Sequence, residues 1–200
     1  MTEREKASED LLTPGEAAKL LHVSPVTLRH WAIDQKLNFV VTPGGHRRFR
    51  IADIQEFVAA SKKGYPNAAS TVLIVDDDSH HARFLADFFA DFQPETTTLI
   101  ADNGFKAADL LHRFRPDLVL LDLMMPGMNG FDVCKHIKTD SISAGIPVIA
   151  MTGFPSRENV ERILEAGAES CLGKPIDLAD LRFTIRQLIG TTNDIESSSA

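Results

Sequence analysis

Cysteine is scarce in this chain of 200 residues, which contains only Cys134 and Cys171. Neither lies in a metal-type spacing, so we expect reduced thiols in a cytoplasmic protein. No apolar stretch approaches the ~20 residues that span a bilayer, and we expect no membrane association. The residues after Met1 are polar and charged with no apolar run behind them, which argues against a secretory signal. What is present, 44% apolar and 24% charged residues, is typical of a soluble globular protein.

The net charge of −7 is unevenly distributed along the chain. Residues 11–63 carry eight Lys and Arg residues against four acidic ones, a net charge of +4. Residues 64–200 carry eleven basic residues against twenty acidic ones, a net charge of −9. A basic N-terminal module joined to an acidic C-terminal one indicates a nucleic-acid partner for the first half and not for the second.

Composition divides the chain into two domains and three connecting or terminal segments. Residues 1–10 are charged and lack periodicity, so we expect a flexible N-terminus. Residues 61–70 are polar and contain Gly and Pro, as a linker does. Residues 191–200 are rich in Ser and Thr and are expected to form a flexible tail. The two predicted domains are residues 11–60 and 71–190.

The first domain begins with the pattern of two short helices. Thr13 can cap the first helix, Pro14 suits its first position and Glu16 completes a capping box. Ser24 and Pro25 start the second helix by the same device. Two short helices joined by so tight a turn predict a helix-turn-helix, whose second helix commonly enters the major groove. In that helix we expect Val26, Leu28, Trp31, Ala32 and Ile33 to pack inward, and Thr27, Arg29, His30 and Gln35 to face solvent or a partner.

A cationic hairpin follows. Residues 37–41 and 46–50 read as strands around a Thr-Pro-Gly-Gly turn, and residues 51–58 as a closing helix. A hairpin with cations at its tip resembles the wing of a winged helix, which reaches phosphates or the minor groove.

Three sequence motifs give this domain a specific resemblance to one known family. Residues 11–60 resemble the MerR/excisionase-type winged helix-turn-helix through Thr-Pro-Gly-Glu-Ala-Ala, Val-Ser-Pro-Val-Thr-Leu-Arg-His-Trp and Gly-Gly-His-Arg-Arg-Phe. Full MerR regulators continue into a long dimerising helix, whereas this chain passes into the predicted linker, so the mode of dimerisation is open. The resemblance implies DNA contacts from the second helix and the wing, which by position are Thr27, Arg29, His30, His46, Arg47 and Arg48.

From residue 71 strands alternate with helices, which predicts a flavodoxin-like, doubly wound parallel sheet of five strands, an α/β fold. The expected strands are residues 71–75, 96–101, 118–122, 146–151 and 170–172, and the expected helices are residues 79–92, 105–114, 131–138, 157–166 and 178–189.

The third strand ends in a single carboxylate, Asp122, before Pro126 and Gly127 turn the chain. Its branched apolar residues fit a buried parallel strand, and open α/β sheets place ligand sites at the C-terminal strand edge. On this strand alone, Asp122 could equally be a phosphoacceptor or a structural residue capping the loop.

Polar residues at the other strand ends favour the phosphoacceptor. Three carboxylates at one edge would repel one another unless a hard divalent cation such as Mg²⁺ lay between them. Lys174 would supply a cation and Thr152 a hydroxyl donor to the phosphoryl group, while Gly153 leaves room for access. Lys174–Pro175 is a candidate cis peptide. The expected Mg²⁺ ligands are Asp77 and Asp122 directly, Asp76 through water, and the main-chain carbonyl of Met124.

Residues 71–190 also resemble the receiver domain of two-component response regulators. The matching motifs are Val-Asp-Asp-Asp, Leu-Leu-Asp-Leu-Met-Met-Pro-Gly-Met-Asn-Gly, Ala-Met-Thr-Gly and Gly-Lys-Pro. The resemblance implies phosphotransfer from a histidine kinase or phosphotransfer protein to Asp122, and slow Mg²⁺-dependent loss of the phosphate, with no other enzyme activity. Thr152 and an aromatic residue on strand five usually form the switch. Here the aromatic position is Cys171, so either the switch is weaker or a side chain such as Phe154 takes its part.

The leading hypothesis is a DNA-binding response regulator that controls transcription and forms a phosphorylation-dependent homodimer. One alternative keeps the receiver but makes the N-terminal module a protein-interaction adaptor, because +4 is a modest charge. Another is a haloacid-dehalogenase-type phosphatase with Asp76 as nucleophile, although the acidic pair that such enzymes need after the lysine is missing.

Overall fold

The structure is a computed structural model that describes residues 11–60 and 70–189. They fold as two compact units, one ending at Arg115 and the other beginning at Pro116. The predicted flexible segments 1–10 and 191–200, and the predicted linker apart from Ser70, lie outside the described residues. The domain boundaries drawn from the sequence therefore stay predictions.

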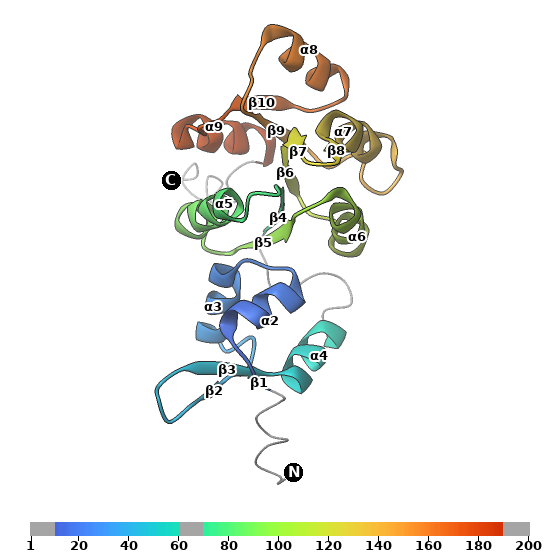
Figure 1. The fold of residues 1–200 in the computed structure, drawn as a ribbon. Helices are drawn as coiled ribbons and strands as arrows, with labels where there is room; N and C mark the ends of the chain where they lie inside the picture. The colour runs from blue at the N-terminus through green and yellow to red at the C-terminus, as the bar shows by residue number, and fades with distance from the viewer. Residues whose placement is uncertain (1–10, 61–69, 190–200) are drawn as a thin grey trace, which may run out of the picture. The chain divides into compact units, whose positions relative to one another are not determined.

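The first unit begins with three short helices and a small antiparallel sheet (Figure 1). The sheet order is β1-β3-β2, so the hairpin formed by β2 and β3 is extended by a short strand, β1, that the sequence did not predict. The elements are β1 (Leu11–Leu12), α2 (Pro14–Leu21), α3 (Pro25–Ile33), β2 (Val40–Val41), β3 (Arg47–Arg50) and α4 (Ile51–Ala60).

Capping residues fix the starts of α2 and α3 as predicted. The Thr13 hydroxyl accepts a hydrogen bond from the Glu16 amide at 3.3 Å, and the Glu16 carboxylate accepts one from the Thr13 amide at 2.8 Å. The Ser24 hydroxyl accepts one from the Thr27 amide at 3.0 Å. Between the helices His22 takes a left-handed conformation, with φ 57°, which ends α2 and turns the chain into α3. One otherwise unpaired amide in the first turn of each helix thus has a side-chain partner.

Three expectations for this region were wrong. Ile33 is 57% exposed because it lies five positions after buried Leu28, on the other side of α3. Thr27, expected to face outward, is only 5% exposed. Residues 37–39 do not join β2, because the Lys36 and Leu37 amides both donate to the Trp31 carbonyl and wrap the chain around the end of α3.

Five parallel strands form one sheet in the order β10-β9-β6-β4-β5, the flavodoxin-like order that was predicted. In the first unit α5 and α6 lie on opposite sides of β4 and β5, and in the second α7 and α9 flank β6 and β9 (Figure 1). The first unit holds β4 (Ser70–Val75), α5 (Ser79–Phe92), β5 (Thr96–Ala101) and α6 (Gly104–Phe114). The second holds β6 (Leu118–Asp122), β7 (Met124–Met125), β8 (Met128–Asn129), α7 (Gly130–Thr139), β9 (Val148–Thr152), α8 (Arg157–Glu165), β10 (Ser170–Gly173) and α9 (Leu178–Ile189).

Burial explains why β6 and β9 read as unbroken apolar runs. Every residue of both strands is buried, as in central parallel strands covered on both faces. The predicted turn after β6 is a tight hairpin in which Met125 pairs with Met128 and Gly127 has φ 71°. Pro followed by Gly with positive φ suits a type II turn. None of the helices in residues 11–60 and 70–189 is long and apolar enough to cross a membrane.

Candidate functional site

Asp122 is the last residue of β6, and each oxygen of its carboxylate accepts a hydrogen bond. It is 4% exposed, and its Oδ1 accepts a hydrogen bond from the Met124 amide at 3.0 Å. Its Oδ2 accepts one from the Lys174 ammonium at 2.8 Å. The lysine side chain is 22% exposed, so it contacts solvent while paired with a nearly buried carboxylate. This arrangement places a positive charge 2.8 Å from one oxygen of the Asp122 carboxylate.

Thr152 and Lys174 are neighbours through the backbone of two paired strands. Thr152, the last residue of β9, is opposite Gly173 in the register of β10, and the Lys174 amide donates to the Thr152 carbonyl at 2.7 Å. The Thr152 hydroxyl is buried and accepts a hydrogen bond from the Phe154 amide at 3.1 Å. The Lys174–Pro175 peptide is cis, as predicted. Because the Thr152 hydroxyl is the acceptor in its hydrogen bond with the Phe154 amide, its own proton takes no part in that bond.

The acidic residues after β4 differ in their environments. Asp76 is 1% exposed, and its oxygens pair with the Asp78 amide at 2.9 Å and with His81 Nδ1 at 2.5 Å. Asp77 is exposed. Asp78 caps α5, where hydrogen bonds from the His80 and His81 amides lower the pKa of its carboxyl group. The contact of His81 with Asp76 was not predicted; the only sequence signal was its position on the first turn of α5.

Three carboxylates gather closely enough to hold a metal ion. One oxygen each from Asp76, Asp77 and Asp122 lies within 4.8 Å of the others. The set contains only oxygen donors, which suits a hard cation such as Mg²⁺ better than the nitrogen and sulfur donors that zinc prefers. Three negative charges at this separation also repel unless a cation is present. The residues therefore fit Mg²⁺, and the predicted ligation by the Met124 carbonyl stays a prediction.

The predicted switch residue Cys171 lies on β10, opposite Ala150 of β9. It is a partly exposed free cysteine, and burial raises the pKa of its thiol. The side chain of Phe154, the alternative switch residue, is 67% exposed. The roles of both residues stay predictions.

Gly130 supports the chain that follows Asp122 in a way that sequence reasoning missed. A Cβ atom at Gly130 would lie 2.5 Å from Leu123 Cα and 2.8 Å from the Asp122 carbonyl oxygen. Only a residue without a side chain lets the start of α7 approach the backbone after Asp122 so closely. The signal in the sequence was a glycine directly after the helix-capping Asn129.

Three of the six predicted DNA contacts are exposed residues of the helix-turn-helix and the hairpin. Arg29, His46 and Arg47 are exposed and Arg48 is half-buried. The Arg47 guanidinium lies over the Phe39 ring, 4.8 Å from its centroid, which restricts where its charge can point. Arg29 on α3 and Arg47 on the hairpin are therefore accessible positive charges.

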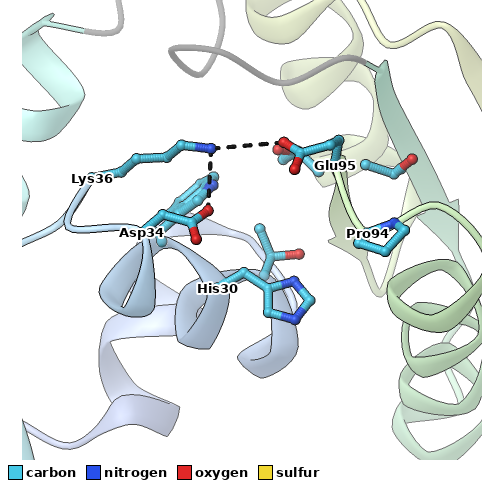
Figure 2. Close-up of a pocket in the computed structure, with 9 residues that line it drawn as sticks. His30, Asp34, Lys36, Pro94 and Glu95 are labelled. Carbon is cyan, nitrogen blue, oxygen red and sulfur yellow. Dashed lines mark ion pairs between the residues drawn. The ribbon is translucent and has the colours of Figure 1, made fainter. Parts of the chain in front are cut away.

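Thr27 and His30 have different surroundings from these cations. The Thr27 hydroxyl is hydrogen-bonded to the hydroxyls of Ser24 and Thr98, both at 2.9 Å. His30 is half-buried and lines a small pocket together with Pro94 and Glu95 (Figure 2). Two of the six predicted DNA contacts thus lie against β5 or the segment that leads into it.

Comparison with known families separates the chain into two matches. A model described as the response regulator receiver domain matches residues 72–186, and one described as a helix-turn-helix domain matches residues 11–62. Both agree with the two resemblances drawn from the sequence.

Individual relatives match the β/α part of the chain. The polar-differentiation response regulator DivK of Brucella anthropi is 35% identical over 120 residues, 60% of this chain and 96% of that protein. The DNA-binding response regulator MtrA of Mycobacterium tuberculosis is 37% identical over 123 residues, 62% of this chain but only 52% of that protein. The chain therefore spans about half the length of this second relative.

Solved structures give the same result. The signal receiver domain of a DNA-binding response regulator (merR) from Colwellia psychrerythraea is 46% identical, with a TM-score of 0.59, and the match covers 61% of this chain and 99% of that one. A receiver domain of a Pseudomonas aeruginosa sensor histidine kinase, solved with magnesium in its active-site cleft, is 23% identical with a TM-score of 0.56 and shares the fold. The chain belongs to the response regulator receiver domain family and carries a helix-turn-helix domain ahead of its receiver.

Proposed function

We propose that this protein is a cytoplasmic DNA-binding response regulator. Asp122 accepts a phosphoryl group from a histidine kinase or phosphotransfer protein, and the helix-turn-helix domain controls transcription. The observation that carries the proposal is the buried Asp122 carboxylate, paired with Lys174 at 2.8 Å and close to the carboxylates of Asp76 and Asp77. Two relatives described as DNA-binding response regulators, MtrA and the Colwellia protein, support DNA over a protein adaptor.

The residues around Asp122 have the chemistry that phosphotransfer requires. One Asp122 oxygen attacks the phosphorus, its bond to phosphorus forms as the phosphorus–nitrogen bond of phosphohistidine breaks, and the departing imidazole takes up a proton. The Lys174 ammonium then donates hydrogen bonds to the phosphoryl oxygens. Thr152 donates its hydroxyl proton to another phosphoryl oxygen.

Asp76, Asp77 and Asp122 would hold Mg²⁺, with the Met124 carbonyl as a further ligand. When bound, the ion supplies positive charge that offsets the carboxylates and the incoming phosphoryl oxygens. His81 pairs with Asp76 Oδ2 and the Asp78 amide with Oδ1, so both keep the Asp76 carboxylate in one orientation.

Phosphorylation adds about two negative charges at Asp122. Thr152 and Lys174 would turn toward them and bias the face of the last two α/β units toward self-association, with Cys171 at the position where related receivers carry an aromatic residue. Two linked helix-turn-helix domains would then gain affinity for paired half-sites.

Two features weigh against the phosphatase alternative. Asp76, its nucleophile, is 1% exposed with hydrogen bonds to both oxygens. After Lys174 the chain enters α9 and not a strand with a second acidic pair.

Phosphate labelling tests the proposal directly. Incubation with acetyl phosphate and Mg²⁺ should add one phosphoryl group to the full chain, detected by intact-protein mass spectrometry, and chelation of Mg²⁺ should prevent it. Asp122→Asn should remove the label because the amide is not a nucleophile. The control Asp87→Asn alters an exposed carboxylate on α5 and should label normally. Labelling of Asp122→Asn at the level of the unmodified chain would disprove the proposal.

A further inference from the structure

The turn between α2 and α3, here called the docking turn (residues 22–24), lies along the edge strand β5. Val23 and Leu99 form an antiparallel bridge. The Ser24 amide donates to the Thr98 carbonyl, and the Ile100 amide donates to the His22 carbonyl, both at 3.1 Å. An edge strand otherwise leaves such groups unpaired. The docking turn therefore pairs with the edge of β5, and Thr97, Thr98 and Leu99 are at most 2% exposed on this edge strand.

Three hydroxyl groups join the docking turn and α3 to β5. The oxygens of Ser24, Thr27 and Thr98 lie 2.9 Å from one another, and the Thr98 amide also donates to the Thr27 hydroxyl at 3.3 Å. The three residues are between 0% and 5% exposed. Buried hydroxyls need hydrogen-bond partners, and these three satisfy one another. The contact is therefore specific, and removing one hydroxyl leaves the other two incompletely bonded.

Ion pairs at the edge of the contact between α3 and the segment before β5 contribute little to its stability. Lys36 lies between Asp34 at 3.3 Å and Glu95 at 4.0 Å, and the Glu95 side chain is 69% exposed (Figure 2). Exposed ion pairs at such distances add little net stability. The buried hydroxyls and the backbone pairing with β5 hold the docking turn in place.

Docking uses the part of α3 that would read DNA. The second helix of a helix-turn-helix contacts base edges through its N-terminal residues. Here Thr27, the third residue of α3, is buried against Thr98, and His30 faces the pocket beside Pro94 and Glu95 (Figure 2). A duplex that contacted Thr27 would have to occupy the position of β5.

We propose that strand β5 of the receiver masks the recognition helix α3, so that DNA binding through α3 requires the docking turn to leave β5. The proposal rests on the DNA-binding function proposed above. It makes DNA and β5 competitors for one surface, while Arg29 and the cations of the hairpin stay accessible. The apparent DNA affinity is then the affinity of the released form multiplied by the fraction of chains that are released.

The variant Thr98→Val tests the masking in the full chain. Valine keeps the β-branched shape but removes the hydroxyl shared by Ser24 and Thr27, and position 98 is outside the DNA-binding domain. We expect roughly a five- to hundredfold rise in affinity for a labelled random-sequence duplex, measured by fluorescence anisotropy. The control is Thr139→Val, whose hydroxyl donates to main-chain carbonyls on α7 in the second unit, and it should leave the affinity unchanged.

Hydrogen exchange followed by NMR gives a second readout that does not depend on DNA. The Ser24 and Ile100 amides, which pair across the contact, should be protected in the unmodified chain and in Thr139→Val, and should exchange faster in Thr98→Val. Unprotected Ser24 and Ile100 amides in the unmodified chain would overturn docking. Faster exchange in Thr98→Val without a gain in affinity would overturn masking. Faster exchange in Thr98→Val together with no DNA binding by any variant would disprove the proposed DNA-binding function. Masking would then be disproved as well, whereas the contact between the docking turn and β5 would be supported.

Discussion

At Gly130 a single missing side chain sets how closely α7 approaches the backbone after Asp122. In Gly130→Ala the new methyl group would meet the backbone at Leu123 Cα and the Asp122 carbonyl, which cannot move aside as a flexible side chain would. Overpacking of this kind costs about 1–3 kcal/mol. We therefore expect the free energy of unfolding, measured by urea denaturation, to fall by this amount, and phosphate labelling of Asp122 to slow.

Gly145→Ala is the matched control, because a Cβ atom at position 145 would have no neighbour within 4 Å. It should leave the free energy of unfolding nearly unchanged. An equal loss in both variants would show that general glycine-to-alanine effects, and not the close approach to Leu123, determine the result.

Site residues were predictable where few residue types can supply the chemistry that the site needs. Asp122, Asp76 and Asp77 were singled out because carboxylates that follow parallel strands meet at one edge, and their oxygens do lie close together. The roles of His81 and Gly130 were not predicted. A hydrogen bond to Asp76 and a backbone distance to Leu123 depend on where a helix packs, which one sequence does not specify.

At the scale of elements, the hairpin of β2 and β3 carries the clearest electrostatic expectation. Replacing both Arg47 and Arg48 by Ala should weaken binding to a random-sequence duplex. It should also reduce the slope of log affinity against log salt concentration by about two, because each lost phosphate contact releases about one counterion fewer. Fluorescence anisotropy over a salt series measures both quantities.

Lys135→Ala controls for loss of positive charge alone, since Lys135 is exposed on α7 in the second unit. Its salt slope should match that of the unmodified chain. An unchanged slope in the double arginine variant would favour the protein-adaptor alternative for the N-terminal domain.

Element boundaries were predicted well where hydrophobic period and caps agreed. The helices Ser79–Phe92 and Leu178–Ile189 and the strands Thr96–Ala101 and Leu118–Asp122 begin and end as expected. The expected strand at residues 37–41 was shortened to β2, because the Trp31 carbonyl draws the Lys36 and Leu37 amides toward the end of α3. The strand propensity of residues 37–39 was outweighed by the need of a carbonyl at the end of α3 for hydrogen-bond donors.

At the scale of the whole molecule, docking of residues 22–24 should depend on pH. His22 contacts β5 through its carbonyl, and its Nδ1 has no hydrogen-bond partner among the described residues. Burial first, and then the α6 cations Lys106 and Arg113, hold the pKa of His22 below its ordinary value of 6.5, although Asp109 on α6 and Asp102 just before it oppose this.

Because a lowered pKa favours neutral His22 in the docked form, the released form binds the proton more readily as pH falls below 6.5. Docking should be constant above 6.5 and weaken below it, until the docked form is protonated as well. Protection of the Ile100 amide, corrected for intrinsic exchange, should decrease over this range.

The variant His22→Asn identifies the titrating group, since asparagine tolerates the left-handed conformation of residue 22 but carries no titratable ring. Its Ile100 protection should be independent of pH. If the variant shows the same pH dependence as the unmodified chain, a group other than His22 controls docking.

The sequence by itself determined the β/α order, the helix-turn-helix and the acidic and basic residues expected at each site. These depend on period, capping and residue chemistry, which are local properties. Only the tertiary structure decided that Thr27 faces Thr98, more than seventy positions away, and is buried instead of exposed. From its position on α3 alone, the Thr27 hydroxyl could equally have faced solvent. Pairing with the uncovered edge of β5 is a contact between distant segments, and no local pattern encodes it.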